Sequence, residues 1–278
     1  MTRYGMVIDV DRCTGCFNCF LACRDEHAGN DHRPVSAAQP AGHSWIKVQE
    51  LERGSFPKVK VSYVPVPCLQ CTDAPCMRAA TGGAMARRAD AIVIIDPDKA
   101  IGQRDIVSAC PYGAVFWNDV ENLPQKCTFC AHLLDDGWTE PRCVEACPVQ
   151  ALVFGDLEDP TSDVARLIAQ KPVEALAPVP AEPPPVRYLG LPTRFVAGEI
   201  VLGDGSEECA EGVSVSLRKG QQTFTISTDN YGDFEFLGLE ADTEYVLSIE
   251  HAGYERFELH WNSSADPNIG TIVIERAG

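Results

Sequence analysis

The sequence lacks any apolar run approaching the roughly 20 residues that are needed to span a bilayer. Its first nine residues also lack the charged region, apolar stretch and cleavage site of a signal peptide. We therefore expect a cytoplasmic protein that is not itself inserted into a membrane. Export together with a partner that carries its own signal is the alternative.

Positive charge is scarce, with 23 Lys and Arg against 40 Asp and Glu, which gives a net charge of −17. Nucleic acid is therefore not an expected partner, because phosphate binding needs a basic patch. The acid is unevenly spread: residues 194–278 hold 16 acidic against 5 basic residues, and the rest holds 24 against 18. This difference indicates two domains.

A disulfide framework is not expected either, because the cysteine count of 13 is odd and no secretion signal is visible. The sequence also has no Cys-x2-Cys-His motif, which excludes covalently attached haem. Twelve of the cysteines precede residue 148, many of them two residues apart. Thiols at this spacing in a reducing compartment are typical metal ligands.

The first cysteine group is a bacterial ferredoxin run, Cys13-x2-Cys16-x2-Cys19-x3-Cys23. In such a run three thiolates converge on one iron–sulfur cube, and the fourth reaches a second cube. Zinc is the alternative, but zinc sites use two separated close pairs, and three thiolates within seven residues fit them badly. The spacing therefore predicts [4Fe–4S] clusters.

The other cysteines form three further groups in the same half of the chain. They are Cys68-x2-Cys71-x4-Cys76, the single Cys110 followed by Pro111, and Cys127-x2-Cys130-x12-Cys143-x3-Cys147 followed by Pro148. A ferredoxin run often ends in Cys-Pro, so Cys110 and Cys147 fit as terminal cysteines.

An internal repeat explains the irregular middle of the chain. When residues 6–23 are placed on residues 93–110, Cys23 meets Cys110, but the other three cysteines meet Ala100, Gln103 and Ile106. When the second group is placed on the fourth, Cys147 meets Ala80. The chain is thus a duplicated two-cluster ferredoxin in which four thiolates are missing. Under crossed ligation all four would have served one cluster.

Three complete sets of four thiolates remain, and they use all 12 of these cysteines. We assign them to cluster 1 (Cys13, Cys16, Cys19, Cys147), cluster 2 (Cys23, Cys127, Cys130, Cys143) and cluster 3 (Cys68, Cys71, Cys76, Cys110).

Some residues near the clusters have two interpretations. Lys126 and Arg142 precede cysteines and either offset cluster charge or are solvated basic residues. Cys209 is predicted to be a small buried hydrophobic residue without a redox role. Ordinary structural roles are predicted for the four histidines of this half, because every cluster already has four thiolates: His27, His32, His43 and His132.

The pattern predicts an α+β fold, with a duplicated bacterial-ferredoxin-like domain over residues 1–160. Residues 161–193 are predicted to be a short helix capped by Thr161 or Ser162 and then a proline-rich linker or strap. Residues 194–278 alternate with period two, which predicts a small all-β sandwich. The expected strands are 92–95 and 151–154 in the first domain and 195–201, 213–217, 224–227, 234–236, 245–249 and 272–274 in the second.

The four cysteine groups, in this order, resemble the iron–sulfur subunit of molybdopterin oxidoreductases of the dimethyl sulfoxide reductase family. The missing cluster set, the motifs Gln125-Lys126-Cys127-Thr128 and Ala131-His132-Leu133-Leu134, and the added C-terminal domain are similar to the small subunit of its pyrogallol–phloroglucinol transhydroxylase branch. The C-terminal domain resembles sandwiches of the collagen-adhesin B-type and carboxypeptidase regulatory-like kind, through residues 228–236 and Gly253-Tyr254.

The resemblance implies a heterodimer with a large catalytic subunit, which holds molybdenum or tungsten on molybdopterin guanine dinucleotide. It implies an electron path from cluster 1 to cluster 3, a missing outermost cluster, and a phenolic substrate such as pyrogallol, resorcinol or a catechol. We expect no catalytic site on this chain. The alternatives are a free-standing polyferredoxin and a structural zinc protein.

Overall fold

The computed structural model describes residues 2–178, 181–203, 205 and 209–278 and divides the chain into two compact units. The first unit comprises Met1–Glu50 and Ser62–Leu191, and the second comprises Leu51–Val61 and Pro192–Gly278. Residues 51–61, which are expected in the first domain from the sequence, belong instead to the second unit. These residues form the tip of a hairpin that the sequence pattern does not predict, and this tip groups with the second unit.

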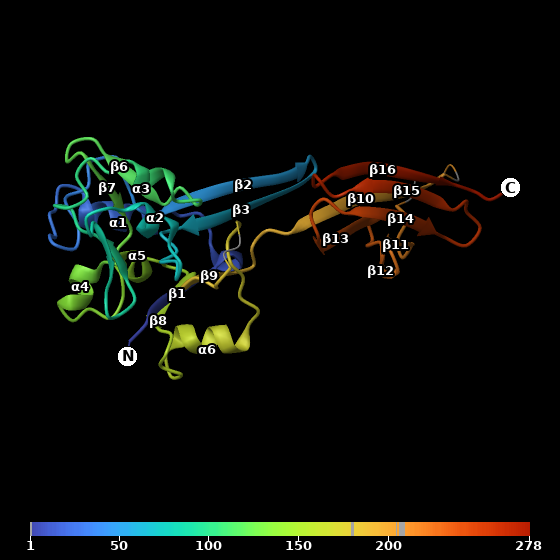
Figure 1. Ribbon diagram of the computed structural model, residues 1–278. Helices are drawn as coiled ribbons and strands as arrows, with labels where there is room; N and C mark the ends of the chain where they lie inside the picture. Colours follow the sequence, from blue (N-terminus) through green and yellow to red (C-terminus); the bar gives the residue numbers. More distant parts are fainter. Residues whose placement is uncertain (1, 179–180, 204, 206–208) are drawn as a thin grey trace. The chain divides into compact units, whose positions relative to one another are not determined.

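The first unit is built from short helices and strands joined by loops (Figure 1), and its cysteines lie in the loops and in the short helices. Its strands are β1 (Tyr4–Asp9), β4 (Met85–Arg87), β5 (Val93–Ile95), β6 (Val115–Asn118), β7 (Leu123–Lys126), β8 (Leu152–Asp156) and β9 (Val186–Leu189), and the hairpin β2 (Lys47–Ser55) and β3 (Lys58–Val66) starts from it. Its helices are η1 (Val10–Arg12), α1 (Asn18–His27), α2 (Pro75–Ala79), α3 (Asp105–Ser108), α4 (Ala131–Asp135), α5 (Arg142–Glu145) and α6 (Asp163–Gln170).

A three-stranded sheet, β8-β1-β9, holds the two ends of the first unit together. In β1, Ile8 pairs with Leu152 of the antiparallel β8 and with Tyr188 of the parallel β9. The apolar run of β1 is buried on both faces: Met6 and Ile8 face the main core, and Val7 packs with Val164 of α6. Pairing of β1 with β8 places the loops that follow β1 and precede β8 side by side.

The proline-rich segment lies along the first unit instead of leaving it directly. Its strand β9 contributes Tyr188, which is fully buried and donates a hydrogen bond from Oη to the Pro65 carbonyl at 3.1 Å. Farther up the segment, the Pro178 carbonyl accepts a hydrogen bond from Tyr112 Oη at 2.8 Å. The segment is therefore a strap over this unit.

The second unit consists mainly of two sheets that share one core. One sheet has the order β13-β10-β16, and the other has the order β12-β11-β14-β15. Alternate residues such as Val215, Leu217, Leu247 and Ile249 point into this core, which explains the period of two in the sequence. The strands are β10 (Arg194–Gly203), β11 (Ser214–Lys219), β12 (Gln222–Ser227), β13 (Asp233–Leu239), β14 (Glu244–Glu250), β15 (Phe257–Asn262) and β16 (Asn268–Glu275).

The tip of the β2–β3 hairpin is tied to β13 of the second unit by charge. Lys58 pairs with Asp233, and Lys60 Nζ lies 3.0 Å from Glu235 Oε1. The two lysines are two residues apart on β3, and their two acidic partners are two residues apart on β13. The two ion pairs therefore align one face of the hairpin tip with one edge of the sheet. Among the described residues, none of the helices is long and apolar enough to cross a membrane.

Candidate metal centres

The first group of thiols lies where β1 ends and β8 begins. The loop between Cys13 and Cys19 follows η1, and Cys147 lies just before β8, so the β1–β8 pairing brings the two segments together. Gly15 turns this loop at a positive φ of 68°. A Cβ atom there would lie 2.6 Å from the ring of Tyr63, so the turn needs glycine for its backbone angle and for space.

The ionisation of these thiols indicates that the four are neighbours. Burial raises the pKa of Cys13, and charges on Cys147 and Cys16 raise it further. Burial raises the pKa of Cys19 to about 12, and Cys13 and Cys147 again add to the rise. Thiolates repel in this way only when they lie close together.

The second group combines Cys23 on α1 with three cysteines from the last run. Burial raises the pKa of Cys127 to about 12, and charge on Cys23 adds to the rise. Burial also raises the pKa of Cys143 far above its ordinary value, and charges on Cys130 and Cys127 add to the rise. The fourth cysteine of each ferredoxin run thus lies with the other run, as crossed ligation requires.

The third group surrounds a small cavity next to the start of α2 and the end of α3. The cavity is lined by Cys68, Cys71, Cys76 and Cys110, together with the buried Lys126. Burial raises the pKa of Cys71 to about 12, and the other three thiols add to the rise.

All 13 cysteines are free thiols, and the three groups suit a cationic iron–sulfur core. Four thiolates at close range need a cation to offset their repulsion, and soft sulfur donors favour iron–sulfur clusters. Amide donors that would stabilise bound thiolates point at one sulfur in each group: Ala151 N lies 3.2 Å from Cys147 Sγ, Phe129 N 3.4 Å from Cys127 Sγ, and Ala114 N 3.4 Å from Cys110 Sγ. The residues therefore fit the group, and the ligand assignment stays a prediction.

Comparison with known proteins agrees with this geometry. A 4Fe-4S dicluster domain family matches residues 59–157. The pyrogallol hydroxytransferase small subunit of Pelobacter acidigallici is 38% identical over 91% of this chain and 92% of its own length. The chain belongs to the family of iron–sulfur subunits of molybdopterin oxidoreductases. It is an iron–sulfur electron-transfer subunit of this family.

Other family members match a shorter part of the chain. An iron–sulfur subunit from Halobacterium salinarum, named for dimethyl sulfoxide reductase, is 34% identical over 68% of this chain and 79% of its own length. The arsenate respiratory reductase iron–sulfur subunit of a Shewanella strain is 32% identical over 67% of this chain and 96% of its own length. A minor pilin of Streptococcus agalactiae covers 34% of the chain at 19% identity and a TM-score of 0.27, which is too low to carry an argument.

The position of the fourth thiolate set is filled by protein. Ala100 and Ile106 are fully buried in a small core, and Ala80 packs against it. Gln103 closes the edge: its Oε1 accepts from the Thr81 amide at 2.9 Å, and its Nε2 donates to the Thr81 carbonyl at 3.2 Å. None of these four positions holds a cysteine, and the alanine, glutamine and isoleucine side chains fill the space.

Lys126 and Arg142, each of which had two interpretations, differ in the structure. Lys126 is 2% exposed, and its ammonium donates to the main-chain oxygens of Val93 and Cys127. It lines the cavity of the third thiol group, so a solvated role is wrong for this residue. Arg142 is about one-third exposed and pairs with Glu26 and Glu145, as a surface cation does.

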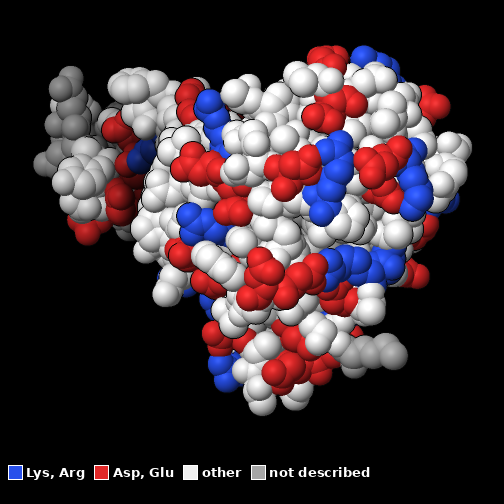
Figure 2. All heavy atoms as spheres, turned by 90° about the vertical axis from the view of Figure 1, so that its left-hand side faces the viewer, with Lys and Arg blue, Asp and Glu red and all other residues white. Residues whose placement is uncertain are grey.

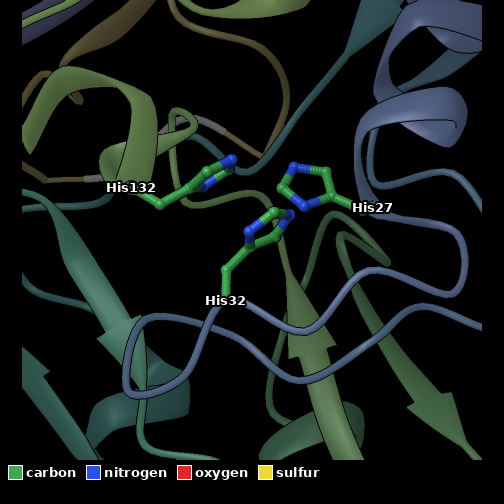
Figure 3. Close-up of side chains that lie close together, drawn as sticks. All are labelled: His27, His32 and His132. Atoms are coloured by element: carbon green, nitrogen blue, oxygen red, sulfur yellow. The ribbon is translucent and has the colours of Figure 1, made fainter. Parts of the chain in front are cut away.

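The structure brings three of the four histidines together beside the second thiol group. One nitrogen each of His27, His32 and His132 lies within 4.8 Å of the others, and Figure 3 shows the three rings converging. Burial lowers the pKa of His27 to about 3, and His132 and His32 add to the decrease. No spacing along the chain signals this cluster, because His132 is 100 residues from His32. The fourth, His43, lies instead beside the Phe116 ring.

Cys209 corrects a prediction, because its side chain is exposed and not buried. It forms an isolated bridge opposite Val201, the half-buried neighbour of the fully buried Ile200. Partners across a bridge point to the same face, so Cys209 points outward with Val201 and away from the core. The exposure of Cys209 is therefore set by the alternation of inward and outward residues along the paired strands, and not by its residue type.

Proposed function

We propose that this chain carries three [4Fe–4S] clusters and transfers electrons to or from a large molybdopterin-binding subunit. The observation that carries the proposal is the gathering of 12 thiols as three groups of four. Cluster 1 would be held by Cys13, Cys16, Cys19 and Cys147, cluster 2 by Cys23, Cys127, Cys130 and Cys143, and cluster 3 by Cys68, Cys71, Cys76 and Cys110. When bound, each cluster supplies one-electron redox chemistry.

The order of the groups supports a single path. Charge on Cys19 contributes to the raised pKa of Cys143, which links the first group to the second. Charge on Cys68 contributes to the raised pKa of Cys127, which links the second group to the third. With the fourth position filled by protein, the third group is the far end of the path.

The surface around the first group supports contact with a partner there. Cys16 is exposed, and the neighbouring Phe17 and Leu21 are 39% and 51% exposed. Apolar side chains around a redox centre suit a protein interface, which is depleted of charge at its core. Figure 2 shows one face of the molecule, over which acidic and basic side chains are interspersed. The partner would hold molybdenum or tungsten on molybdopterin guanine dinucleotide and would contribute the catalytic site.

The extent of sequence similarity supports a phenolic substrate for the complex. The relatives named for dimethyl sulfoxide and arsenate reduction match 68% and 67% of this chain, whereas the small subunit of pyrogallol hydroxytransferase matches 91%. We therefore propose that the complex hydroxylates, dehydroxylates or transhydroxylates aromatics such as pyrogallol, resorcinol or catechols. This chain itself would take no part in the chemistry on the ring.

For the second unit we propose a β-sandwich of the collagen-adhesin B-type or carboxypeptidase regulatory-like class, acting as a docking or stabilising module. Its two sheets share one core with residues from both, including Ile200, Phe234 and Val215. Within this unit, the pair between Lys58 of the hairpin tip and Asp233 supports a module that holds the tip of the hairpin in place.

Metal analysis of the native complex, purified without oxygen and with its subunits identified by mass, tests the proposal. We expect about 12 iron atoms per copy of this chain, one molybdenum or tungsten, and a large second subunit. An iron count near eight would contradict the three ligand sets. Full iron without a partner or pterin metal would instead favour a free-standing polyferredoxin.

A matched pair of variants tests the ligand assignment. Cys110→Ser should lower the iron count by about four atoms, because a cubane cluster that loses one thiolate ligand becomes labile. Cys209→Ser, at an exposed cysteine outside all three groups, should leave the iron count unchanged. An unchanged iron count in Cys110→Ser would overturn the assignment of cluster 3.

A further inference from the structure

We propose that His27, His32 and His132, with Glu26 as a fourth ligand, form a binding site for a zinc-type divalent cation. The site would be separate from the thiol groups and would join α1 to α4. The proposal goes beyond electron transfer and does not rest on the number of clusters. It is carried by a convergence of donors that no sequence spacing imposes.

The three rings approach from three segments of the first unit. His27 ends α1, His32 lies in the loop after it, and His132 is in α4, as Figure 3 shows. One nitrogen from each ring lies within 4.8 Å of the other two. Neutral imidazole is a preferred ligand of zinc at about 2.0–2.1 Å, which requires nitrogens roughly 3.3 Å apart in a tetrahedron. Cation binding therefore requires the nitrogens to move closer together and the stacked rings to reorient.

The carboxylate of Glu26 provides the fourth donor. Its Oε1 lies 2.9 Å from His132 Nε2 and 3.9 Å from His32 Nε2. Its other oxygen, Oε2, lies 3.4 Å from Arg142 Nε, which orients the carboxylate toward the rings. A set of three imidazoles and one carboxylate has the donors and the count of a closed zinc site.

His27 has unused donor capacity at this position. Among the described residues, its Nδ1 is buried and has no hydrogen-bond partner. His132, whose Nε2 faces Glu26 Oε1, would bind the same cation through Nε2. Buried polar atoms are normally satisfied, so each such atom needs an explanation. His27 is 1% exposed, and its other nitrogen, Nε2, lies 3.8 Å from Cys130 Sγ. A cation on Nδ1 would thus leave the second thiol group intact.

Ring orientation defines what must change when the cation binds. The rings of His32 and His132 now stack at 3.7 Å with an interplanar angle of 13°. A cation in the plane of both rings requires one of them to turn about χ2, which is a soft torsion in histidine. The His32 side chain is 19% exposed, so its ring has room to turn, and turning breaks the 3.1 Å contact between its Nε2 and the Glu26 carbonyl. Binding also releases any proton held between Glu26 and the rings.

Equilibrium dialysis of the intact complex against ZnCl₂, after treatment with a chelating resin, tests the site. We expect one zinc per copy of the wild-type chain, at least tenfold weaker binding in His32→Gln, and unchanged iron in both. His260→Gln, at an exposed histidine of the second unit, is the matched control and should bind zinc like the wild type. Zinc X-ray absorption should report nitrogen and oxygen ligands without sulfur.

Three results would overturn the site: no zinc bound by the wild-type complex, zinc with sulfur ligands, or equal zinc binding in His32→Gln and the wild type. If His32→Gln loses iron, Glu26→Gln decides, because it keeps the size of the side chain and removes the charged ligand. We expect Glu26→Gln to weaken zinc binding at least tenfold, and unchanged binding would contradict the proposal. The iron count reports on the cluster sets separately, so the two proposals fail independently.

Discussion

Gln103 and Thr81 exchange two hydrogen bonds at the edge of the position where a fourth set of thiolates would lie. Oε1 of Gln103 accepts from the Thr81 amide at 2.9 Å, and its Nε2 donates to the Thr81 carbonyl at 3.2 Å. Behind this pair, Ala100 and Ile106 are fully buried. A small apolar core therefore occupies the position at which the predicted repeat would place a fourth set of ligands.

Truncation of Ile106 tests whether this core stabilises the first unit. Ile106→Ala should lower the free energy of unfolding by about 2–4 kcal/mol, because it leaves a cavity at a fully buried site. The measurement is the guanidinium concentration at which iron–sulfur absorbance is lost. Ile101→Ala, at a residue that is 58% exposed, is the control and should change stability little. Equal effects of the two variants would contradict a packed core.

The buried ammonium of Lys126 should raise the potential of the cluster held by the third group. Its hydrogen-bond acceptors, the carbonyls of Val93 and Cys127, are neutral, so its charge acts on the thiolates that line the same cavity. Lys126→Met should lower that reduction potential by on the order of 59 mV, a tenfold change for one electron.

Redox titration followed by electron paramagnetic resonance measures this shift cluster by cluster. Lys99→Met is the control, because Lys99 is exposed and pairs with Asp96. A potential that stays the same in Lys126→Met, with full iron content, would show that the charge of this lysine does not act on the cluster.

Asp266 should stabilise the second unit strongly. Its side chain is 2% exposed and accepts from the Phe195 amide at 3.0 Å and from Arg194 at 3.1 Å, with Arg53 of the hairpin tip 3.8 Å away. Asp266→Asn leaves two cations without their counter-charge. We expect the free energy of unfolding of this unit to fall by about 2 kcal/mol. The decrease is smaller than for a fully buried ion pair because the arginines are partly exposed.

Hydrogen exchange of peptides from residues 192–278, followed by mass spectrometry on the intact chain, measures this loss. Asp242→Asn, at an exposed aspartate of the same unit, should exchange like the wild type. Faster exchange in both variants to the same degree would mean that lost negative charge in general, and not the buried contact, is responsible.

Gly15 should be needed for the first thiol group. Gly15→Ala forces a residue with a Cβ into φ 68° and against the ring of Tyr63 at 2.6 Å, so the loop must shift and the cluster should be lost. Gly82→Ala is the matched control: its φ is 59°, but a Cβ there meets no atom within 4 Å.

We expect iron to fall by about four atoms per chain in Gly15→Ala and to stay constant in Gly82→Ala, which costs only about 1 kcal/mol of backbone strain. Metal analysis of the two purified variants gives the answer. Constant iron in both would show that the loop tolerates the side chain.

The sequence predicts the metal-binding cysteines of this protein well, because their spacing along the chain is enough to indicate metal binding. Cysteines two residues apart, such as Cys13 and Cys16, can meet one metal core whatever surrounds them, because a tight loop is enough. Repeat symmetry then predicts that Ala100 and Ile106 stand where ligands would lie. The β2–β3 hairpin is not predicted because most of its residues are exposed and its sequence lacks a clean alternation of polar and apolar residues.

The sequence by itself determined the cysteine groups, the repeat that predicts three ligand sets, the change of period at residue 195 and the family to which the chain belongs. These features are local or repeated, so they can be read along the chain. The tertiary structure alone decided that Lys126 is buried, that Cys209 is exposed, and that His27, His32 and His132 meet. Such outcomes depend on which distant segments pack together, and no spacing along the chain encodes that packing.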